Sequence, residues 1–295
     1  MRVPSTFARR IGTAATAASV MTAVCAVSGF AGSRVQNPAP AAVAAAPKTM
    51  AAPMRLTSAS EHAKELFGQA ILLSGNYRLD ECLKSLRTAT TEDGNFAAGW
   101  ALLSYYATDA HEAADALARA QALAGKTSAS ETLFVRWVAA LKKNDQLAAI
   151  SNLNDLVSRE AGDKFVLYLA GRWFVDQHDA QRAVPLFEKV LIFDAAFTPV
   201  LNRLGYSYAA MGDLARAEAM MQRYVAAMPT DPNPEDSYGD ILFKAGRYQD
   251  AKAHFEAALR KDPGFGPSQH ELGDVYAMLG NQQGAREAYE KSARV

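Results

Sequence analysis

The chain has 295 residues, of which 49% are hydrophobic and 21% charged, so it can bury a large core and lacks the composition of a disordered protein. Residues 1–60 contain six basic residues and no acidic one, which leaves 31 acidic against 25 basic residues in the rest. Because neutralisation of phosphates supplies most of the affinity for DNA and RNA, an acidic body without Lys/Arg tracts predicts no nucleic-acid partner.

The first 33 residues have the pattern of an export signal. Three arginines precede a charge-free stretch over residues 11–33 that is rich in Ala, Val and Thr. A short basic segment followed by an apolar one is typical of a secretory signal peptide. Small residues allow cleavage after Ser28 or after Ala31. We therefore expect a periplasmic or secreted protein.

Other interpretations of this segment stay open. Residues 11–33 are long enough for a membrane anchor, although polar residues interrupt them, so a membrane-anchored protein is the alternative. A mitochondrial transit peptide and lipid attachment at Cys25 are further alternatives. If cleavage removes Cys25, Cys82 is the only cysteine left, which excludes an intramolecular disulfide. Contact with a membrane is expected only through this segment.

Residues 34–57 are rich in Pro and Ala. Pro38, Pro40, Pro47 and Pro53 prevent a long helix. This composition predicts a flexible linker over residues 34–57.

Beyond the linker, three columns of residues recur every 34 positions. The first column is glycine, the second is alanine, and the third places a large apolar residue four positions after each alanine. The columns are Gly171, Gly205, Gly239 and Gly273; Ala149, Ala183, Ala217, Ala251 and Ala285; and Leu153, Phe187, Met221, Phe255 and Tyr289. Small residues let two helices cross closely, and the large residue fills the space beside them.

Further residues complete a known pattern. Aromatic residues stand three positions after two of the glycines, prolines close two units, and turn glycines separate the two helices of three units: Tyr208, Tyr276, Pro229, Pro263, Gly212, Gly246 and Gly280. Together with the columns, these residues resemble the tetratricopeptide repeat family. The resemblance implies an all-α fold, a right-handed helical solenoid of antiparallel helix pairs that each contact only their neighbours.

The resemblance covers residues 58–295 and is strongest from about Lys164 onward. Seven units are expected, near 61–96, 97–129, 130–163, 164–197, 198–231, 232–265 and 266–295. In the third unit Trp137 stands where glycine is expected, which predicts a wider gap between its helices and the weakest point of the array.

No pattern in the array indicates catalysis. It contains no glycine-rich phosphate loop, no HExxH pair and no GxSxG elbow. The five histidines lie in different units, without the spacing of metal ligands. We expect no catalytic residue, no cofactor and no metal, and hence no enzyme.

The resemblance implies that a ligand binds on the concave face, at the fifth, sixth and ninth positions of each first helix. In two successive units these positions carry the predicted peptide-binding patch: Tyr168, Arg172, Asn202, Arg203 and Tyr206. Aromatic faces suit apolar side chains, and guanidinium groups suit carboxylates or peptide carbonyls. Pro199 stands where carboxylate-clamping members of the family have Lys. An acidic stretch follows the patch: Asp236, Asp240, Glu271 and Asp274.

The predicted function is a protein- or peptide-binding scaffold of the cell envelope that acts through its concave face. Two alternatives are an anchored envelope assembly factor and an accessory subunit of an envelope enzyme with unrecognised chemistry. The binding partner is a protein or peptide whose identity the fold does not supply.

Overall fold

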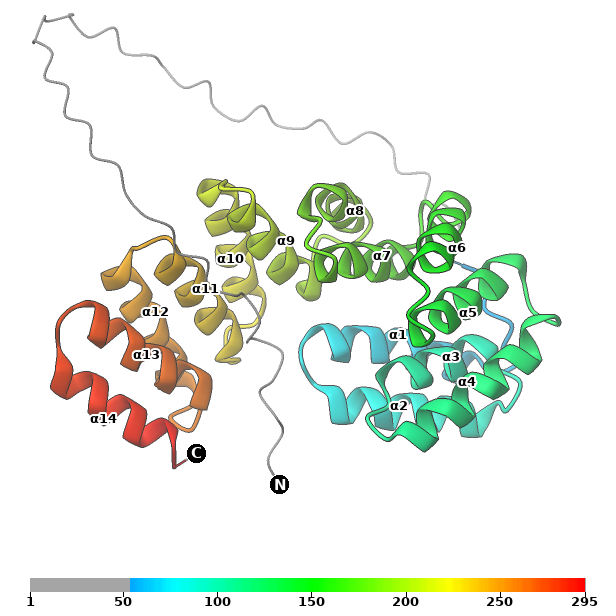
Figure 1. Ribbon diagram of the computed structural model, residues 1–295, viewed down its shortest axis with the longest axis horizontal. Coiled ribbons are helices and arrows are strands. Elements are labelled where there is room, and N and C mark those ends of the chain that lie inside the picture. The colour runs from blue at the N-terminus through cyan, green and yellow to red at the C-terminus, as the bar shows by residue number, and fades with distance from the viewer. Residues whose placement is uncertain (1–53, 295) are drawn as a thin grey trace, which may run out of the picture. The chain divides into compact units, whose positions relative to one another are not determined.

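The computed structural model describes residues 54–294, so the predicted signal segment and linker residues 34–53 lie outside the described part. The described part contains fourteen helices and no strand, which confirms the all-α prediction (Figure 1). The helices are α1 Glu61–Gly75, α2 Leu79–Glu92, α3 Ala97–Tyr106, α4 Ala110–Ala124, α5 Ala129–Lys142, α6 Gln146–Arg159, α7 Lys164–Asp176, α8 Ala180–Phe193, α9 Thr198–Ala210, α10 Leu214–Ala227, α11 Asn233–Lys244, α12 Tyr248–Lys261, α13 Gly266–Met278 and α14 Gln282–Ser292.

Each pair of helices is joined by a tight turn. Gly212, Gly246 and Gly280 have φ values of 80°, 77° and 76°, the left-handed conformation that glycine adopts without steric cost. The turns predicted from these glycines are therefore confirmed. Three earlier turns place other residues in the same conformation: Tyr77 at φ 61°, Asn144 at 55° and His178 at 59°.

The glycine column brings the two helices of a pair together. A Cβ atom on Gly171 would lie 2.5 Å from the Phe187 ring, and one on Gly239 would lie 2.7 Å from the Phe255 ring. Both rings are fully buried. Only glycine leaves room for these rings, so the first and third columns of the repeat are packing partners.

The helices form an inner and an outer layer. Among the odd-numbered helices, α3 packs on α5, α7 on α9, α9 on α11, and α11 on α13. The even-numbered helices contact the odd-numbered helices beside them and make no comparable contact with one another. The first helix of each pair therefore lines the inner side of the array.

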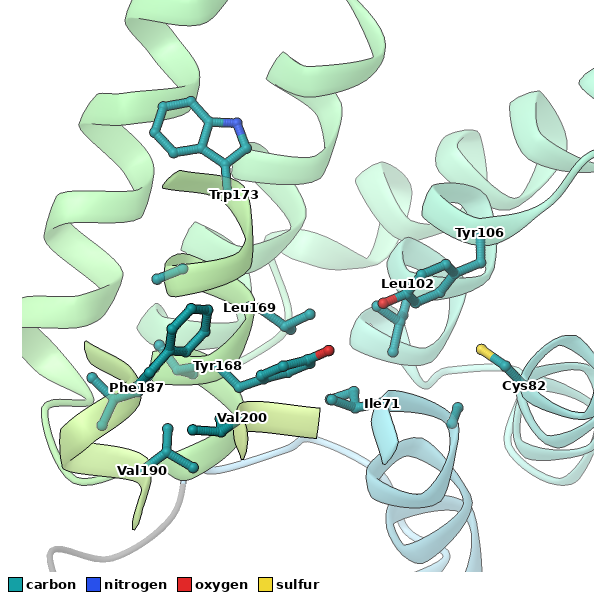
Figure 2. Packing of buried hydrophobic residues seen from close by; sticks show 14 of the residues in the cluster. Ile71, Cys82, Leu102, Tyr106, Tyr168, Leu169, Trp173, Phe187, Val190 and Val200 are labelled. Atoms are coloured by element: carbon teal, nitrogen blue, oxygen red, sulfur yellow. The ribbon is translucent and has the colours of Figure 1, made fainter. Parts of the chain in front are cut away.

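The array departs from contact between neighbours alone, because α1 also packs against α9. A Cβ atom on Gly75 would lie 2.5 Å from Cβ of Pro199 and 2.6 Å from the Tyr168 hydroxyl oxygen. Figure 2 shows the Tyr168 ring reaching from α7 toward Ile71 of α1. The expectation of neighbour-only contacts is thus wrong here: aromatic side chains fill the inner side between the first pair and the fourth and fifth pairs.

Trp137 does not separate the helices of its pair as predicted. Its ring is buried and lies 6.1 Å from Tyr105 of α3 and 5.8 Å from Phe134, measured between ring centroids. The side chain is accommodated toward the preceding pair, and α5 still packs along α6. The weakest contact between successive pairs lies after this pair, between α6 and α7. Every other pair makes more extensive contact with the pair that follows it.

The segment from Met54 to Ser60, which we call the strap, packs across three pairs. The backbone N–H of Met54 donates to Asp163 Oδ2 at 2.7 Å, and that of Thr57 donates to Glu131 Oε2 at 2.7 Å. The N–H of Ala59 donates to Asp93 Oδ2 at 2.8 Å. The packed region therefore begins by Met54, inside the predicted linker, because the buried carboxylates of Asp163 and Glu131 and the half-buried one of Asp93 accept backbone donors of the strap.

Candidate functional site

The inner face divides into a filled half and an open half. In the part of the array from α1 to α9, the inner side chains form a core. It includes Phe67, Ile71, Leu102, Phe134 and Val138, each exposed by 2% or less. On α11 and α13 the corresponding side chains are partly exposed and polar. The predicted binding patch lies where the two halves meet.

Two residues of the predicted patch are buried. Tyr168 is 0% exposed and packs on Phe197, with 5.3 Å between ring centroids. Asn202 is 1% exposed, and its Nδ2 donates to Ser237 Oγ at 3.0 Å. The first helix pair covers Tyr168, and Asn202 joins α9 to α11. The prediction that these two side chains are presented to a ligand is therefore wrong in this structure.

The other three residues of the patch are half-buried. Arg172 Nη1 donates to the Tyr106 hydroxyl at 2.6 Å, which links α7 to α3. The Arg203 guanidinium lies over the Tyr77 ring at 5.6 Å. The Lys244 ammonium lies 5.5 Å from the centre of the Tyr206 ring. The structure therefore brings these residues to the edge of the filled half and surrounds them with aromatic rings.

The open half of the inner face is acidic. Asp240 of α11 pairs with Lys244 at 2.6 Å, and Asp236 Oδ1 accepts a hydrogen bond from Ser268 at 2.6 Å. On α13, Asp274 Oδ1 accepts a hydrogen bond from the Tyr289 hydroxyl at 2.5 Å. Glu271 lies on the same face of α13, three residues before Asp274. We call these four carboxylates the acidic face: Asp236, Asp240, Glu271 and Asp274.

The pKa values show how closely these carboxylates interact. Burial raises the pKa of Glu271 to about 7, and the negative charges of Asp240, Asp274 and Asp236 contribute in the same direction. Burial also raises the pKa of Asp236 to about 6, against the hydrogen bond from Ser268. Ionised carboxylates therefore destabilise one another here, and a positively charged partner would relieve that repulsion.

The described part offers no arrangement for a metal, since no group of three or more His, Cys, Asp or Glu side chains is placed to hold one. Of the described helices, none combines the length and the apolar character that crossing a membrane requires. Cys82 is fully buried, and burial raises the pKa of its thiol to about 12, so the thiol is protonated at neutral pH.

Three aromatic residues beside the two arginines of the patch were not predicted from the sequence: Tyr77, Tyr105 and Tyr106. Tyr105 and Tyr106 belong to α3, whose unit matches the repeat weakly. Tyr77 occupies the turn position that Gly212, Gly246 and Gly280 fill in later units. The only indication of Tyr77 in the sequence was a bulky residue at a turn position that favours glycine.

Two family models of the tetratricopeptide repeat match the chain, one over residues 174–235 and the other over residues 239–294. Both matches fall in the half where the sequence columns are most regular. Among curated proteins, none matches this sequence.

Solved structures of helical repeat proteins are similar to this chain. A tetratricopeptide repeat protein from Parabacteroides merdae ATCC 43184 has a TM-score of 0.52 at 17% identity, over 80% of this chain and 93% of its own. A MamA protein from Desulfovibrio magneticus RS-1, residues 41 to the end, has a TM-score of 0.49 at 21% identity, over 56% and 93%. The first likeness shows the fold and nothing finer. The family matches identify tetratricopeptide repeats in residues 174–235 and 239–294.

Proposed function

We propose that this protein is a non-catalytic scaffold that binds a Lys- or Arg-rich segment of another protein on its acidic face. The observation that carries the proposal is the clustering of four carboxylates on the inner face of α11 and α13. Lys244, which pairs with Asp240, partly offsets their negative charge. Holding them together costs stability, since burial and mutual repulsion disfavour their ionised forms. A basic segment would compensate that charge, and the filled half of the inner face leaves this surface as the open one.

The predicted export signal supports a place in the cell envelope, either periplasmic or secreted, and an uncleaved segment 11–33 would anchor the protein instead. An anchored assembly factor or an accessory subunit of an envelope enzyme would use the same surface. Intact mass of the mature protein separates these options, because cleavage, lipidation and retention of residues 1–33 give different masses.

The binding proposal is tested with a fluorescein-labelled 12-residue peptide of alternating Lys and Ser and its Glu and Ser counterpart, by fluorescence anisotropy. We expect the Lys peptide to bind, and its affinity to rise between pH 6 and pH 8 as Glu271 ionises. The double variant Asp240→Asn/Asp274→Asn should weaken binding at least tenfold.

The matched control is Glu287→Gln/Glu290→Gln, which removes two exposed carboxylates from α14. This control should bind like the wild type. Equal weakening by both double variants would mean that only net charge attracts the peptide, and the acidic face would then have no special role.

A further inference from the structure

The glycines of α1 face a distant part of the array instead of their own pair. Gly68 is the eighth residue of the first unit, the position that Gly239 holds in the sixth. A Cβ atom on Gly239 would meet the Phe255 ring of the same pair at 2.7 Å. One on Gly68 would instead lie 3.0 Å from Cζ of Phe165, at the start of α7. The glycine of the first pair therefore allows a close approach of α7.

Gly75 extends this contact to α9. It follows Gly68 by seven residues, about two helical turns, and so lies on the same face of α1. A Cβ atom there would lie 2.5 Å from Cβ of Pro199 and 2.6 Å from the Tyr168 hydroxyl oxygen. Because glycine weakens a helix, two glycines on one face of α1 indicate that its close contact with α7 and α9 is specified by the sequence.

The polar groups at this contact are poorly matched. Tyr168 is 0% exposed, and neither its hydroxyl nor the buried Nε of Arg203 has a hydrogen-bond partner of normal geometry in the described part of the chain. The Tyr77 ring lies over Arg203 and is still 56% exposed. The hydrogen bond from Thr198 Oγ1 to Asn76 Oδ1 is long, at 3.3 Å. A permanently closed interface rarely leaves buried polar groups without partners, so this contact is suited to opening.

The junction between α6 and α7 is where the array can bend, because it has the weakest contact between successive pairs. The first residue of the strap donates to Asp163 across it, while the other strap bonds stay within the first three pairs. Among the described side chains, the hydrogen bonds that join the two sides at a distance from the junction are those of Arg172 to Tyr106 and of Thr198 to Asn76. Apart from the packing of α1, few contacts therefore hold the first three pairs against the last four.

We propose that the first three helix pairs form a reversible cover over the inner face of α7 and α9, which opens about the junction between α6 and α7. Closing buries apolar surface on α1, including Ile71, which is 0% exposed. Opening returns the Tyr168 hydroxyl and the Arg203 guanidinium to water. These effects oppose each other, so the closed and open forms differ by a modest free energy.

The open form would add α7 and α9 to the inner face that α11 and α13 already present. The cover does not depend on the acidic face, and neither proposal requires the other.

The test is thiol labelling of the variant Ile71→Cys, with Cys25→Ser and with Cys82 as the internal control. Both positions are fully buried in the closed form. Figure 2 shows Ile71 at the contact with Tyr168, whereas the sulfur of Cys82 points from α2 toward Leu102 and Tyr106 of α3. Cys82 therefore stays covered when the first three pairs move as one body.

The protein is treated with N-ethylmaleimide under native conditions, and mass spectrometry follows each thiol. We expect the thiol at position 71 to react at least about tenfold faster than Cys82, because local opening requires less free energy than unfolding. Equal rates at the two positions would mean that the contact opens only when the first pair unfolds, and would overturn the proposal.

Gly75→Val, made in the same Ile71→Cys background, should open the cover, because its side chain cannot fit against Pro199. Labelling at position 71 should accelerate further while the Cys82 rate stays unchanged. The matched control is Gly125→Val, where a Cβ atom would meet nothing within 4 Å, and both rates should stay as they were. An unchanged rate at position 71 in a folded Gly75→Val protein would contradict closure by the glycine face. If circular dichroism shows that Gly75→Val does not fold, the comparison of the two thiols without it still decides.

Discussion

Glu271 shows how a single side chain reports on its surroundings. It lies on α13 among three other carboxylates, and burial is the largest cause of its raised pKa, followed by their charges. Its ionised form is therefore less favourable in the folded chain than in the unfolded chain. The folded protein binds more protons than the unfolded one between the ordinary pKa of Glu and a pH of about 7, so Glu271 makes stability fall as pH rises through that window.

Glu271→Gln should therefore raise the melting temperature at pH 8 and leave it nearly unchanged at pH 4. The amide keeps the shape of the side chain without its charge, and we expect a gain of roughly 1 to 2 kcal/mol, or a few degrees. Differential scanning calorimetry across this pH range measures the effect. Glu287→Gln, on the exposed side of α14, serves as the control. A gain for Glu271→Gln that is the same at pH 4 and pH 8 would show that the ionised form of Glu271 is not its cause.

At the scale of the helix pair, the close crossing depends on glycine facing a large side chain. Gly205 and Gly239 occupy the same column, but their partners differ. A Cβ atom on Gly205 would meet the terminal methyl of Met221 at 2.4 Å, whereas one on Gly239 would meet the Phe255 ring at 2.7 Å. A methionine end can rotate away, while a buried ring has no such freedom.

We expect Gly239→Ala to destabilise the protein by about 1 to 3 kcal/mol through overpacking. Gly205→Ala should cost less, because the end of Met221 can move. The helix preference of alanine over glycine, up to about 1 kcal/mol, offsets part of the cost in both variants. Urea unfolding followed by circular dichroism gives both values. A larger loss for Gly205→Ala than for Gly239→Ala would mean that the stiffness of the facing side chain does not set the cost.

At the scale of the whole array, the junction between α6 and α7 has few contacts, and the strap spans it. Contact between α6 and α7 is limited, which leaves the first three pairs and the last four pairs weakly joined along the outer layer. The strap compensates by binding across the first, third and fourth pairs through Asp93, Glu131 and Asp163. Packing of α1 on α9 adds a second connection.

Asp163 lies at this junction and has two roles. It caps α7 by accepting the N–H of Val166 at 2.8 Å, and it accepts the N–H of Met54 from the strap. Asp163→Ala should therefore cost about 2 to 3 kcal/mol, and hydrogen exchange should accelerate first in the strap and the start of α7.

Asp213→Ala is the matched control, since Asp213 caps α10 through the N–H of Arg216 without binding the strap. It should cost about 1 kcal/mol and change exchange only near α10. If the two variants lost the same stability, the strap would contribute nothing across the junction. Uniform protection along residues 54–294 of the wild type would also contradict a weak junction between α6 and α7.

The sequence by itself determined the helix pairs, the turn glycines and the packing columns, because these depend on contacts within one pair that recur every 34 residues. It also placed the acidic face, in which Asp240 and Asp274 occupy equivalent positions in successive repeats. Tertiary structure decided which inner side chains are open. Burial of Tyr168 depends on α1 meeting α9, and residues 120 or more positions apart leave no periodic trace in the sequence. The strap and the aromatic surroundings of Arg172 and Arg203 follow from the same long-range packing, which only the folded chain specifies.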